Sequence, residues 1–379
     1  MTTHTPTGAL SAGPAAGADH LLASAVVRRA TGMLLSAAPG ASAIAVGLHR
    51  EGRRALVVRG HIAHHSHVPA DADTRFEAGS LTKTFTALLL AEQAARGDLG
   101  HHDPLARHLP AATRLPSGGT AITLTHLATH TSGLPRLPPG LLRSAAPLLF
   151  TNPYAAFTPD DVLSALARTR LRAAPGSRVR YSNFGLGLLG HALTGAAGGT
   201  PYPALLDARV LRPLGLRDTG CATSAAEGGG QATGYWYGRA RPPFRIPGLP
   251  AAGALRTSAR DLLALVEAIL DPDPAPAPAS APASAPAAVP GVLRTALSDV
   301  TRPRVRLPNG RGLSLVWNIR RRPDGSDLYH HSGATRGFTA FAGFNPRHAT
   351  ALVALANAAP GPGNALVQEA YNALIGLQG

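Results

Sequence analysis

The sequence contains one cysteine, Cys221, among its 379 residues, so a disulfide bond within the chain is excluded. Its stability must therefore come from a packed core, and a chain of this length can bury a large one. The length suits one large domain or two closely packed domains. A lone thiol requires no oxidising environment and indicates nothing else about the compartment.

Long hydrophobic runs are also absent, because no apolar stretch approaches the roughly 18 residues of a membrane-spanning helix. The segment Met1 to Gly17 is rich in Thr, Ala, Gly and Pro. It has neither the basic start nor the apolar stretch of a signal peptide. We therefore expect a soluble protein with no membrane partner, a cytoplasmic location and a disordered N-terminus over residues 1–19.

Acidic residues are few, with 21 Asp and Glu against 36 Lys and Arg, which gives a formal net charge of +15. Clustered basic side chains neutralise phosphates, so this charge raises the question of nucleic-acid binding. The arginines are dispersed, however, and the densest groups, Arg53-Arg54 and Arg320-Arg321-Arg322, carry no interleaved aromatic residues. We expect no nucleic-acid partner and a solvated surface that can steer anionic small molecules.

Lysine is the rarest basic residue, because only Lys83 among the 36 Lys and Arg residues is a lysine. Arginine stays protonated in proteins and cannot act as a base. Lys83 follows Ser80 by three positions at the start of a predicted helix, Leu81 to Arg96, which Gly97 ends. The half from Phe85 to Ala91 is nearly all apolar, which predicts a buried helix. Burial lowers the pKa of a lysine, and a neutral lysine can take the proton of a serine hydroxyl.

The remaining patterns predict strands near both ends of the chain and helices between them. This order favours an α+β fold in which one antiparallel sheet, built from N- and C-terminal segments and flanked by helices, carries an inserted, mainly helical domain. Predicted helices are Leu21–Leu34, a short one within Thr123–Pro135, Asp160–Ala167, a helix from Arg256–Asp261 to about Leu270, and Asn364–Leu377. Predicted strands are the hairpin Ala43–Leu48 and Ala55–Ile62, then Gly312–Ile319, Phe338–Phe344 and Ala349–Ala356.

The same patterns divide the chain into domains. We assign residues 20–100 and 291–379 to the sheet domain and residues 101–270 to the helical domain. Residues 271–290 form an Asp/Pro/Ala/Ser tract with no means of building a core, and we expect a mobile surface linker there.

A group of histidines, His61, His64, His65 and His67, crowds a short predicted loop and raises the question of a metal site. No cysteine or spaced set of carboxylates completes such a site, so we favour a solvated loop and expect no metal.

Two other patterns are interpreted as structural. Gly185 to Gly190 matches the dinucleotide-binding pattern GxGxxG, but a polar stretch precedes it and no acidic residue follows at the place of a ribose contact. We predict a closely packed helix there and no cofactor. His126 and His130, the two histidines of the predicted short helix that Gly133-Leu134-Pro135 ends, are assigned structural rather than catalytic roles.

Three stretches, Ser80-Leu81-Thr82-Lys83, Tyr181-Ser182-Asn183 and His331-Ser332-Gly333, have the order and approximate separation found in serine β-lactamases and penicillin-binding proteins. Over about residues 20–375 the chain resembles the class C-like branch of that superfamily, which implies a β-lactamase/transpeptidase-like fold. Flanking stretches support the resemblance: Leu124–Pro135, Ala232–Tyr235, Gly253–Asp261 and His331–Phe338.

The resemblance implies roles for these residues. Ser80 would be the nucleophile, Lys83 its base or proton relay, and Tyr181 would share the proton transfer. The backbone N–H groups of Ser80 and Ala334 would form the oxyanion hole, which stabilises the tetrahedral intermediate of acyl transfer. The implied substrate-binding residues are Asn183, which would also orient Lys83, and His331, Ser332 and Gly333, which would line the opposite wall on a β-strand.

Two departures from the family pattern bear on specificity. His331 stands where β-lactamases usually have a lysine, and histidine here is seen among the family's esterases and peptidases. Ala334-Thr335-Arg336 replaces the common Gly-Thr-Pro and brings a bulky cation near the site. Arg336 either recognises a substrate carboxylate or phosphate or is an ordinary surface residue, and the sequence leaves both open.

These inferences favour a serine hydrolase that cleaves an ester or amide of a small molecule through a Ser80 acyl-enzyme. The alternative is an acyltransferase that passes the acyl group to an amine or alcohol, because the sequence does not show whether water enters the acyl-enzyme. The expected partners are a small-molecule acyl donor and either water or a nucleophilic acceptor. A catalytically silent binding protein is disfavoured by the intact Ser80, Lys83 and Tyr181, and an exported β-lactamase or D-Ala-D-Ala peptidase ranks lower. The sequence does not indicate the oligomeric state.

Overall fold

The computed structural model describes residues 24–144, 152–221, 230–273 and 289–378. The predicted disordered segment 1–19 and most of the predicted linker 271–290 lie outside these ranges.

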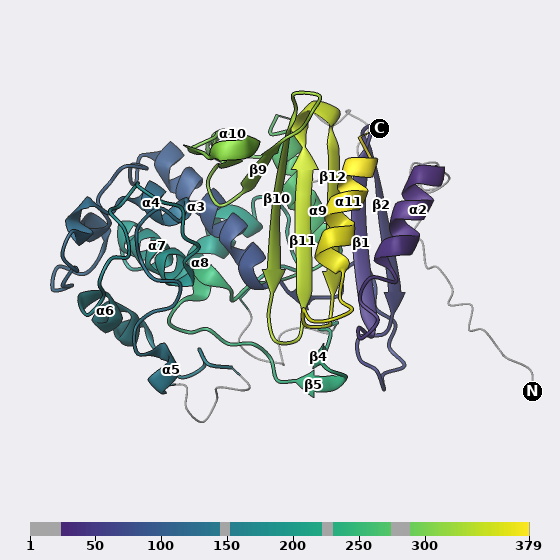
Figure 1. The fold of residues 1–379 in the computed structure, drawn as a ribbon, viewed down its shortest axis with the longest axis horizontal. Helices are drawn as coiled ribbons and strands as arrows, with labels where there is room; N and C mark the ends of the chain where they lie inside the picture. The colour runs from purple at the N-terminus through teal and green to yellow at the C-terminus, as the bar shows by residue number, and fades with distance from the viewer. Residues whose placement is uncertain (1–23, 145–151, 222–229, 274–288, 379) are drawn as a thin grey trace, which may run out of the picture.

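An antiparallel sheet of eight strands forms the centre of the fold, in the order β2-β1-β12-β11-β10-β9-β8-β7 (Figure 1). The N-terminal hairpin joins the C-terminal strands through β1, which pairs with β12 in the register Ile44 with Ala356. The predicted α+β fold with a sheet built from both ends of the chain is confirmed. The strands are β1 (Ala43–Arg50), β2 (Arg53–Gly60), β7 (Val305–Arg306), β8 (Arg311–Leu313), β9 (Asn318–Arg321), β10 (Asp327–Ala334), β11 (Thr339–Asn345) and β12 (Thr350–Ala356).

Helices cover both faces of this sheet. On one face, α11 (Leu366–Gly376) packs on β11 and β12 and also contacts α2 (Ala25–Leu34). On the other, α9 (Ala259–Leu270) packs on β1, β11 and β12. Because β11 and β12 are covered on both faces, every residue in them is buried and their sequences are almost continuously apolar.

The N-terminal hairpin is confirmed, with strands that reach closer to the turn than predicted. Glu51 and Gly52 connect β1 and β2 and have φ angles of 53° and 70°. Two consecutive residues with positive φ give the turn whose twist matches that of the flanking strands, and glycine adopts this conformation without steric cost.

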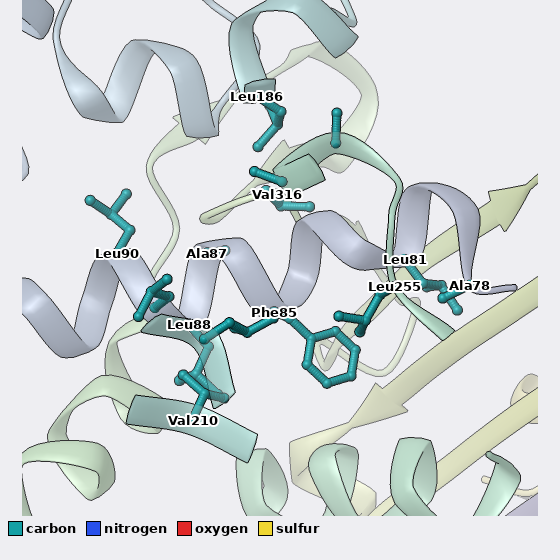
Figure 2. Close-up of a cluster of buried hydrophobic side chains, with 14 of the residues drawn as sticks. Ala78, Leu81, Phe85, Ala87, Leu88, Leu90, Leu186, Val210, Leu255 and Val316 are labelled. Carbon is teal, nitrogen blue, oxygen red and sulfur yellow. The ribbon is translucent and has the colours of Figure 1, made fainter. Parts of the chain in front are cut away.

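The inserted part is mainly helical and surrounds α3 (Thr82–Arg96), whose residues from Thr82 to Gln93 are all buried. Figure 2 shows Phe85 and Leu88 of α3 among side chains from distant segments, including Val210 and Leu255. Other helices are α4 (Leu124–Ala128), α5 (Leu141–Ser144), α6 (Pro159–Ala167), α7 (Asn183–Ala196), α8 (Tyr202–Leu206) and α10 (Gly291–Asp299), and the short strands are β3 (Phe76–Glu77), β4 (Gly234–Trp236), β5 (Arg239–Arg241) and β6 (Arg256–Thr257).

The glycines of the GxGxxG match serve helix packing, as predicted. They lie in α7, against a short turn called η6 (Pro250–Ala252) and the residue before it. A Cβ atom on Gly187 would lie 2.0 Å from Leu249 Cδ2, and one on Gly190 would lie 2.4 Å from the Cβ of Ala251. These distances are shorter than any real contact, so only glycine lets the two segments approach this closely.

One predicted strand is wrong. The stretch Gly312–Ile319 forms the ends of two strands, β8 and β9, joined by a buried turn. Within this turn Val316 has a φ of 70° and donates its N–H to the carbonyl of Ala128, while Trp317 is fully buried. The apolar residues therefore mark a loop that is anchored in the core. Several elements were not predicted from the periodicity of the sequence, among them the strand β10 and the helix α10.

The histidine-rich loop shows no metal site, since no group of three or more His, Cys, Asp or Glu residues in the described ranges could hold a metal ion. His64 instead packs on the ring of Tyr235, with centroids 4.1 Å apart.

None of the helices described has the length and apolarity needed to cross a membrane. The predicted domain boundaries stay a prediction, although α9, which lies in the range assigned to the helical domain, packs on the sheet.

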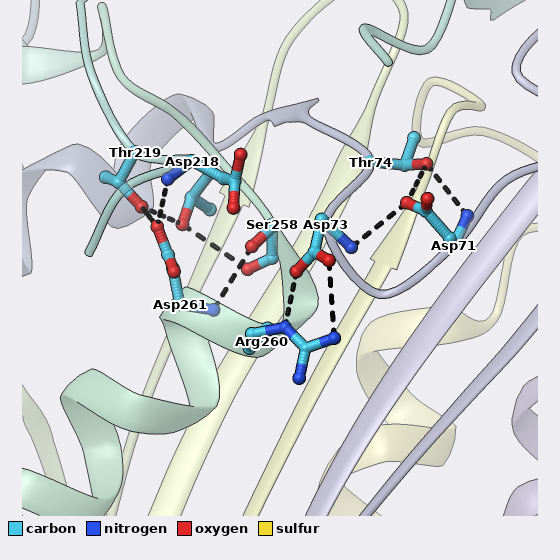
Figure 3. A network of polar contacts seen from close by, with 9 residues as sticks. Asp71, Asp73, Thr74, Asp218, Thr219, Ser258, Arg260 and Asp261 are labelled. Carbon is cyan, nitrogen blue, oxygen red and sulfur yellow. Dashed lines mark hydrogen bonds and ion pairs between the residues drawn. The ribbon is translucent and has the colours of Figure 1, made fainter. Parts of the chain in front are cut away.

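A polar network holds the start of α9 (Figure 3). Ser258 caps this helix by accepting a hydrogen bond from the N–H of Asp261. One carboxylate oxygen of Asp261 accepts from the N–H of Asp218 at 2.7 Å and from the hydroxyl of Thr219 at 2.8 Å. Burial raises the pKa of Asp261 to about 6, and the nearby carboxylates of Asp218 and Asp73 contribute to the shift.

This shift predicts a pH-dependent effect of Asp261→Asn. A carboxyl whose pKa is raised on folding favours the folded state when it is protonated, so the wild type loses stability as the pH rises through about 6. Asparagine can accept the same two hydrogen bonds without ionising. We expect the free energy of unfolding of the variant, relative to wild type, to be about 1 kcal/mol larger at about pH 8 than at about pH 5. Urea denaturation at both pH values measures this difference, and an equal difference at both would show that Asp261 does not titrate in this range.

Candidate active site

Ser80 lies in a one-turn 3-10 helix, η1 (Gly79–Leu81), immediately before α3. The Ser80 side chain makes no capping hydrogen bond to this helix. Gly79 has a φ of 50°, and a Cβ atom there would lie 2.5 Å from the carbonyl oxygen of Ala334. A Cβ atom on Gly333 would lie 1.9 Å from the carbonyl oxygen of Ala78. Glycine on both sides therefore lets the backbone of β10 lie directly against the turn that carries Ser80.

The side chains of Ser80, Lys83 and Tyr181 meet at one point. The Ser80 Oγ lies 2.9 Å from Lys83 Nζ and 2.6 Å from the Tyr181 hydroxyl. Lys83 also donates a hydrogen bond of 2.6 Å to the carbonyl of Ala252 in η6. Two groups that are able to transfer protons thus contact the same hydroxyl oxygen, and this geometry can activate a serine as a nucleophile.

The charge state of Lys83 follows from its position. The side chain is fully buried, and this burial lowers the pKa of its amine. Interaction with Tyr181 opposes the shift, and the positive charge of Arg136 adds to it. A lowered pKa enlarges the fraction of neutral amine, the form that can accept a proton. The role of Lys83 as a base stays a prediction, and its full burial supplies the condition on which that prediction rests.

Asn183 lies at the start of α7, which Ser182 caps by accepting a hydrogen bond of 2.8 Å from Gly185 N–H. The Asn183 Nδ2 donates to the hydroxyl of Tyr154 at 3.1 Å. Its Oδ1 is buried and has no hydrogen-bond partner among the residues described. Asn183 thus retains polar capacity that a bound substrate can use.

A pocket of about 200 Å³ opens over Ser80. Its walls combine apolar and aromatic side chains on one side with the end of β10 and the residues after it on the other. The lining residues are Gly79, Ser80, Pro153, Tyr154, Asn183, Phe244, Ile246, Ala252, Gly253, Ala334, Thr335 and Arg336.

His331, Ser332 and Gly333 lie on β10, as the resemblance implied, and pair with residues of β11. They do not line the pocket, whose wall on this side begins at Ala334. His331 is 4% exposed, and its Nδ1 has no hydrogen-bond partner within the described part of the chain. Burial, assisted by the charge of Lys83, lowers the pKa of His331 well below its ordinary value. Its ring is therefore neutral beside the site.

The remaining predicted residues are placed as follows. Arg336 lines the pocket, and its guanidinium lies over Trp236 of β4, 5.5 Å from the ring centre. Ala334 lies beside the Ser80 turn, because a Cβ atom on Gly79 would be 2.7 Å from the Ala334 nitrogen. The functional roles of all six residues stay predictions. Ser80, Asn183, Ala334 and Arg336 line one pocket, while Lys83 and Tyr181 do not line it and contact the Ser80 oxygen instead.

Several residues of the site were missed in the sequence. Tyr154 and Phe244 form an aromatic wall with ring centroids 5.9 Å apart, and they come from irregular segments without a periodic pattern. Glu77 is buried and accepts a hydrogen bond of 2.7 Å from the N–H of Phe244. A carboxylate between Phe76 and Ala78, just before an apolar helix, was a signal for it. Ala252 acts through its carbonyl, which no sequence pattern reveals.

Comparison with known proteins finds a matching family and several relatives. The model of the family described as Beta-lactamase matches residues 21–377. The D-alanyl-D-alanine-carboxypeptidase/endopeptidase AmpH of Escherichia coli (strain K12) is 39% identical over 155 residues, 41% of this chain and 38% of that protein. A Beta-lactamase of Pseudomonas fluorescens is 34% identical over 207 residues, 54% of this chain and 53% of the relative. Esterase EstB of Burkholderia gladioli is 37% identical over 167 residues, 42% and 41% of the two chains. The matched regions span about half or less of these relatives.

The geometry predicts that Lys83→Arg and Lys83→Met abolish acylation of Ser80. Arginine keeps a positive charge but cannot accept a proton near neutral pH, and methionine keeps most of the unbranched stem without an amine. Loss of general-base help typically slows a reaction by about 10²–10⁴-fold. The rate of adduct formation with a fluorophosphonate, followed by intact-mass spectrometry, measures the effect.

Circular dichroism of the same samples controls for folding. A base should show a far larger loss than about five-fold. A folded variant that is acylated within about five-fold of the wild-type rate would therefore show that Lys83 is not the base and would leave Tyr181 to act alone.

Proposed function

The chain belongs to the Beta-lactamase family, and from this premise we propose that it is a serine hydrolase that cleaves an ester or amide of a small molecule through an acyl-enzyme on Ser80. The observation that carries the proposal is the pair of contacts at the Ser80 oxygen, 2.9 Å to a buried lysine amine and 2.6 Å to a tyrosine hydroxyl. Both groups can accept or donate a proton, so the two contacts give the Ser80 hydroxyl a route for proton transfer.

In the proposed reaction the Ser80 oxygen attacks the acyl carbon as its proton passes to the neutral amine of Lys83, with Tyr181 sharing the transfer. The carbonyl oxygen becomes an oxyanion, which the N–H groups of Ser80 and Ala334 would stabilise. Collapse of the intermediate breaks the bond to the alcohol or amine, which leaves with the proton. Water then attacks the acyl-enzyme, gives its proton to the same groups, and releases a carboxylic acid and free Ser80.

The relatives favour a hydrolase over a protein that only binds its ligand, because their names describe a carboxypeptidase/endopeptidase, a beta-lactamase and an esterase. The apolar wall formed by Tyr154, Phe244 and Ile246 suits an apolar acyl group or leaving group. The ring of His331 is neutral and lies outside the pocket lining, so the cation in this part of the pocket wall is Arg336.

The acyltransferase alternative uses the same acyl-enzyme and differs only in the acceptor. Product analysis in the presence of added amines and alcohols distinguishes the two. Release of the free acid at a rate independent of the acceptor supports a hydrolase, while acylated acceptor as the main product supports a transferase.

The proposal is tested by incubating the protein with a panel of esters, thioesters, amides and β-lactams and measuring its intact mass. We expect a transient acyl adduct with at least one class of ester or amide, and none with Ser80→Ala. Absence of any adduct, together with failure of the folded protein to react with a fluorophosphonate, would refute the proposal and favour a binding protein.

The cytoplasmic location stays a prediction, and recovery of the native protein from an exported fraction would contradict it.

The position of Arg336 in the pocket wall predicts a charge preference. If Arg336 contacts an anionic group of the substrate, Arg336→Ala should lower kcat/KM for an acidic ester roughly ten-fold more than for a matched neutral ester, because a hydrogen bond to a charged group contributes about 1.5–3 kcal/mol. Steady-state kinetics with the two esters measures this ratio.

Arg241→Ala is the matched control. Its guanidinium lies over the same Trp236 ring at 5.3 Å, but Arg241 does not line the pocket. Equal losses for both esters in Arg336→Ala would leave Arg336 without a role in recognition.

A further inference from the structure

Tyr181 lies in a segment that has no regular secondary structure. Residues 178–182 are neither helix nor strand, and α7 begins only at Asn183. A hydroxyl that must stay 2.6 Å from the Ser80 oxygen therefore lacks the repeating hydrogen bonds of a helix or sheet to hold its backbone. The segment needs support from elsewhere in the molecule.

His130 supplies contacts on both sides of Tyr181. Its carbonyl oxygen accepts a hydrogen bond of 2.7 Å from the N–H of Arg180, and its ring Nδ1 accepts one of 3.2 Å from the N–H of Ser182. The His130 ring also packs on the Tyr181 ring, with centroids 4.5 Å apart and an angle of 42° between the planes. One residue thus holds the backbone before and after Tyr181 together with a face of its ring.

The backbone of His130 is itself unusual. It follows the end of α4 with a φ of 58°, in the left-handed region that few residues other than glycine adopt. Asparagine, aspartate and histidine are enriched there, and a conformation of this kind persists only where the surroundings enforce it. His130 is 4% exposed, so the strained turn is fixed in the interior next to the site.

The protonation state of the His130 ring indicates a supporting rather than a catalytic role. Because Nδ1 accepts a backbone hydrogen bond, a neutral ring carries its proton on Nε2, which is buried without a partner in the ranges described. Burial, with a smaller effect from the charge of Lys83, lowers the pKa of His130 to about 3. The ring is therefore neutral at the pH at which Lys83 would act, and its hydrogen bonds go to the Tyr181 segment rather than to Ser80 or Lys83.

We propose that His130 is the positioning residue for Tyr181, holding the tyrosine hydroxyl within hydrogen-bond distance of Ser80 through two backbone contacts and one ring contact. The inference deepens the proposed function and rests on it, since it assumes that Tyr181 takes part in proton transfer from Ser80.

Two substitutions distinguish the side-chain hydrogen bond of His130 from its ring contact with Tyr181. His130→Asn places a carbonyl oxygen near the position of Nδ1 and tolerates a positive φ, so it keeps the bond to Ser182 N–H and loses the ring contact. His130→Ala loses both side-chain contacts. A displacement of about 1 Å can slow a reaction by about 10²-fold, so we expect His130→Ala to lower the acylation rate by about 10-fold to 10²-fold, with little change in KM, and His130→Asn to recover part of that rate.

The sharpest readout is a double-mutant cycle with Tyr181→Phe. If His130 acts through the tyrosine hydroxyl, His130→Ala should cost no more than about two-fold in the Tyr181→Phe background, because residues that act as a unit are not additive. An equal loss in both backgrounds would overturn the proposal. So would wild-type activity of His130→Ala, or unfolding of both His130 variants by circular dichroism, which would assign the residue to fold stability alone.

A crystal structure of His130→Ala, or of His130→Asn if the alanine variant does not fold, gives a readout that needs no turnover. We expect the Tyr181 oxygen to move out of hydrogen-bond distance from Ser80, by a larger shift in the alanine variant, and an unmoved tyrosine would overturn the inference. If the wild-type protein does not react with a fluorophosphonate while the tyrosine does move, the proposed function fails and the positioning role stands.

Discussion

The burial of one amine governs the structure around the active site. Taking the Lys83 side chain out of water costs free energy unless its polar atoms are paired, and the carbonyl of Ala252 and the hydroxyl of Ser80 supply that pairing. Ala252 is available only because Gly187 and Gly190 let α7 approach the η6 turn closely. The sequence of α7, which matches a nucleotide-binding pattern, thus helps to place the carbonyl that accepts a hydrogen bond from Lys83.

Two histidine side chains respond to the charge of this amine. His130 and His331 are both buried, and the pKa of each is lowered by burial and then by the charge of Lys83. Three basic groups therefore share a low-dielectric region in which adding a second proton is unfavourable. This arrangement favours neutral imidazoles and a lysine that readily gives up its proton, and both properties suit a reaction that begins by removing the proton of Ser80.

The parts of the structure that were predicted from sequence depend on local patterns. The apolar run after Lys83, the hairpin residues Glu51-Gly52 and the Gly97 helix end, where φ is 82°, each carry their own signal. The parts that were missed depend on contacts between distant segments. Val316 forms a turn because Ala128 and the core around Trp317 hold it. His130 contacts Arg180 and Ser182, and the contact with Ser182 spans a sequence separation of 52. Periodicity carries no information about such contacts.

The central claim is that Lys83 is neutral enough to act as a base, and the composition of the chain makes this directly measurable. Because Lys83 is the only lysine, labelling lysine with carbon-13 at Cε gives one NMR signal whose chemical shift reports the protonation of this amine. We expect a titration midpoint clearly below the ordinary lysine pKa of 10.5 in the folded protein, returning towards that value on unfolding. A midpoint at or above 10.5 in the folded protein would rule out Lys83 as the base, because the amine would then be fully protonated near neutral pH.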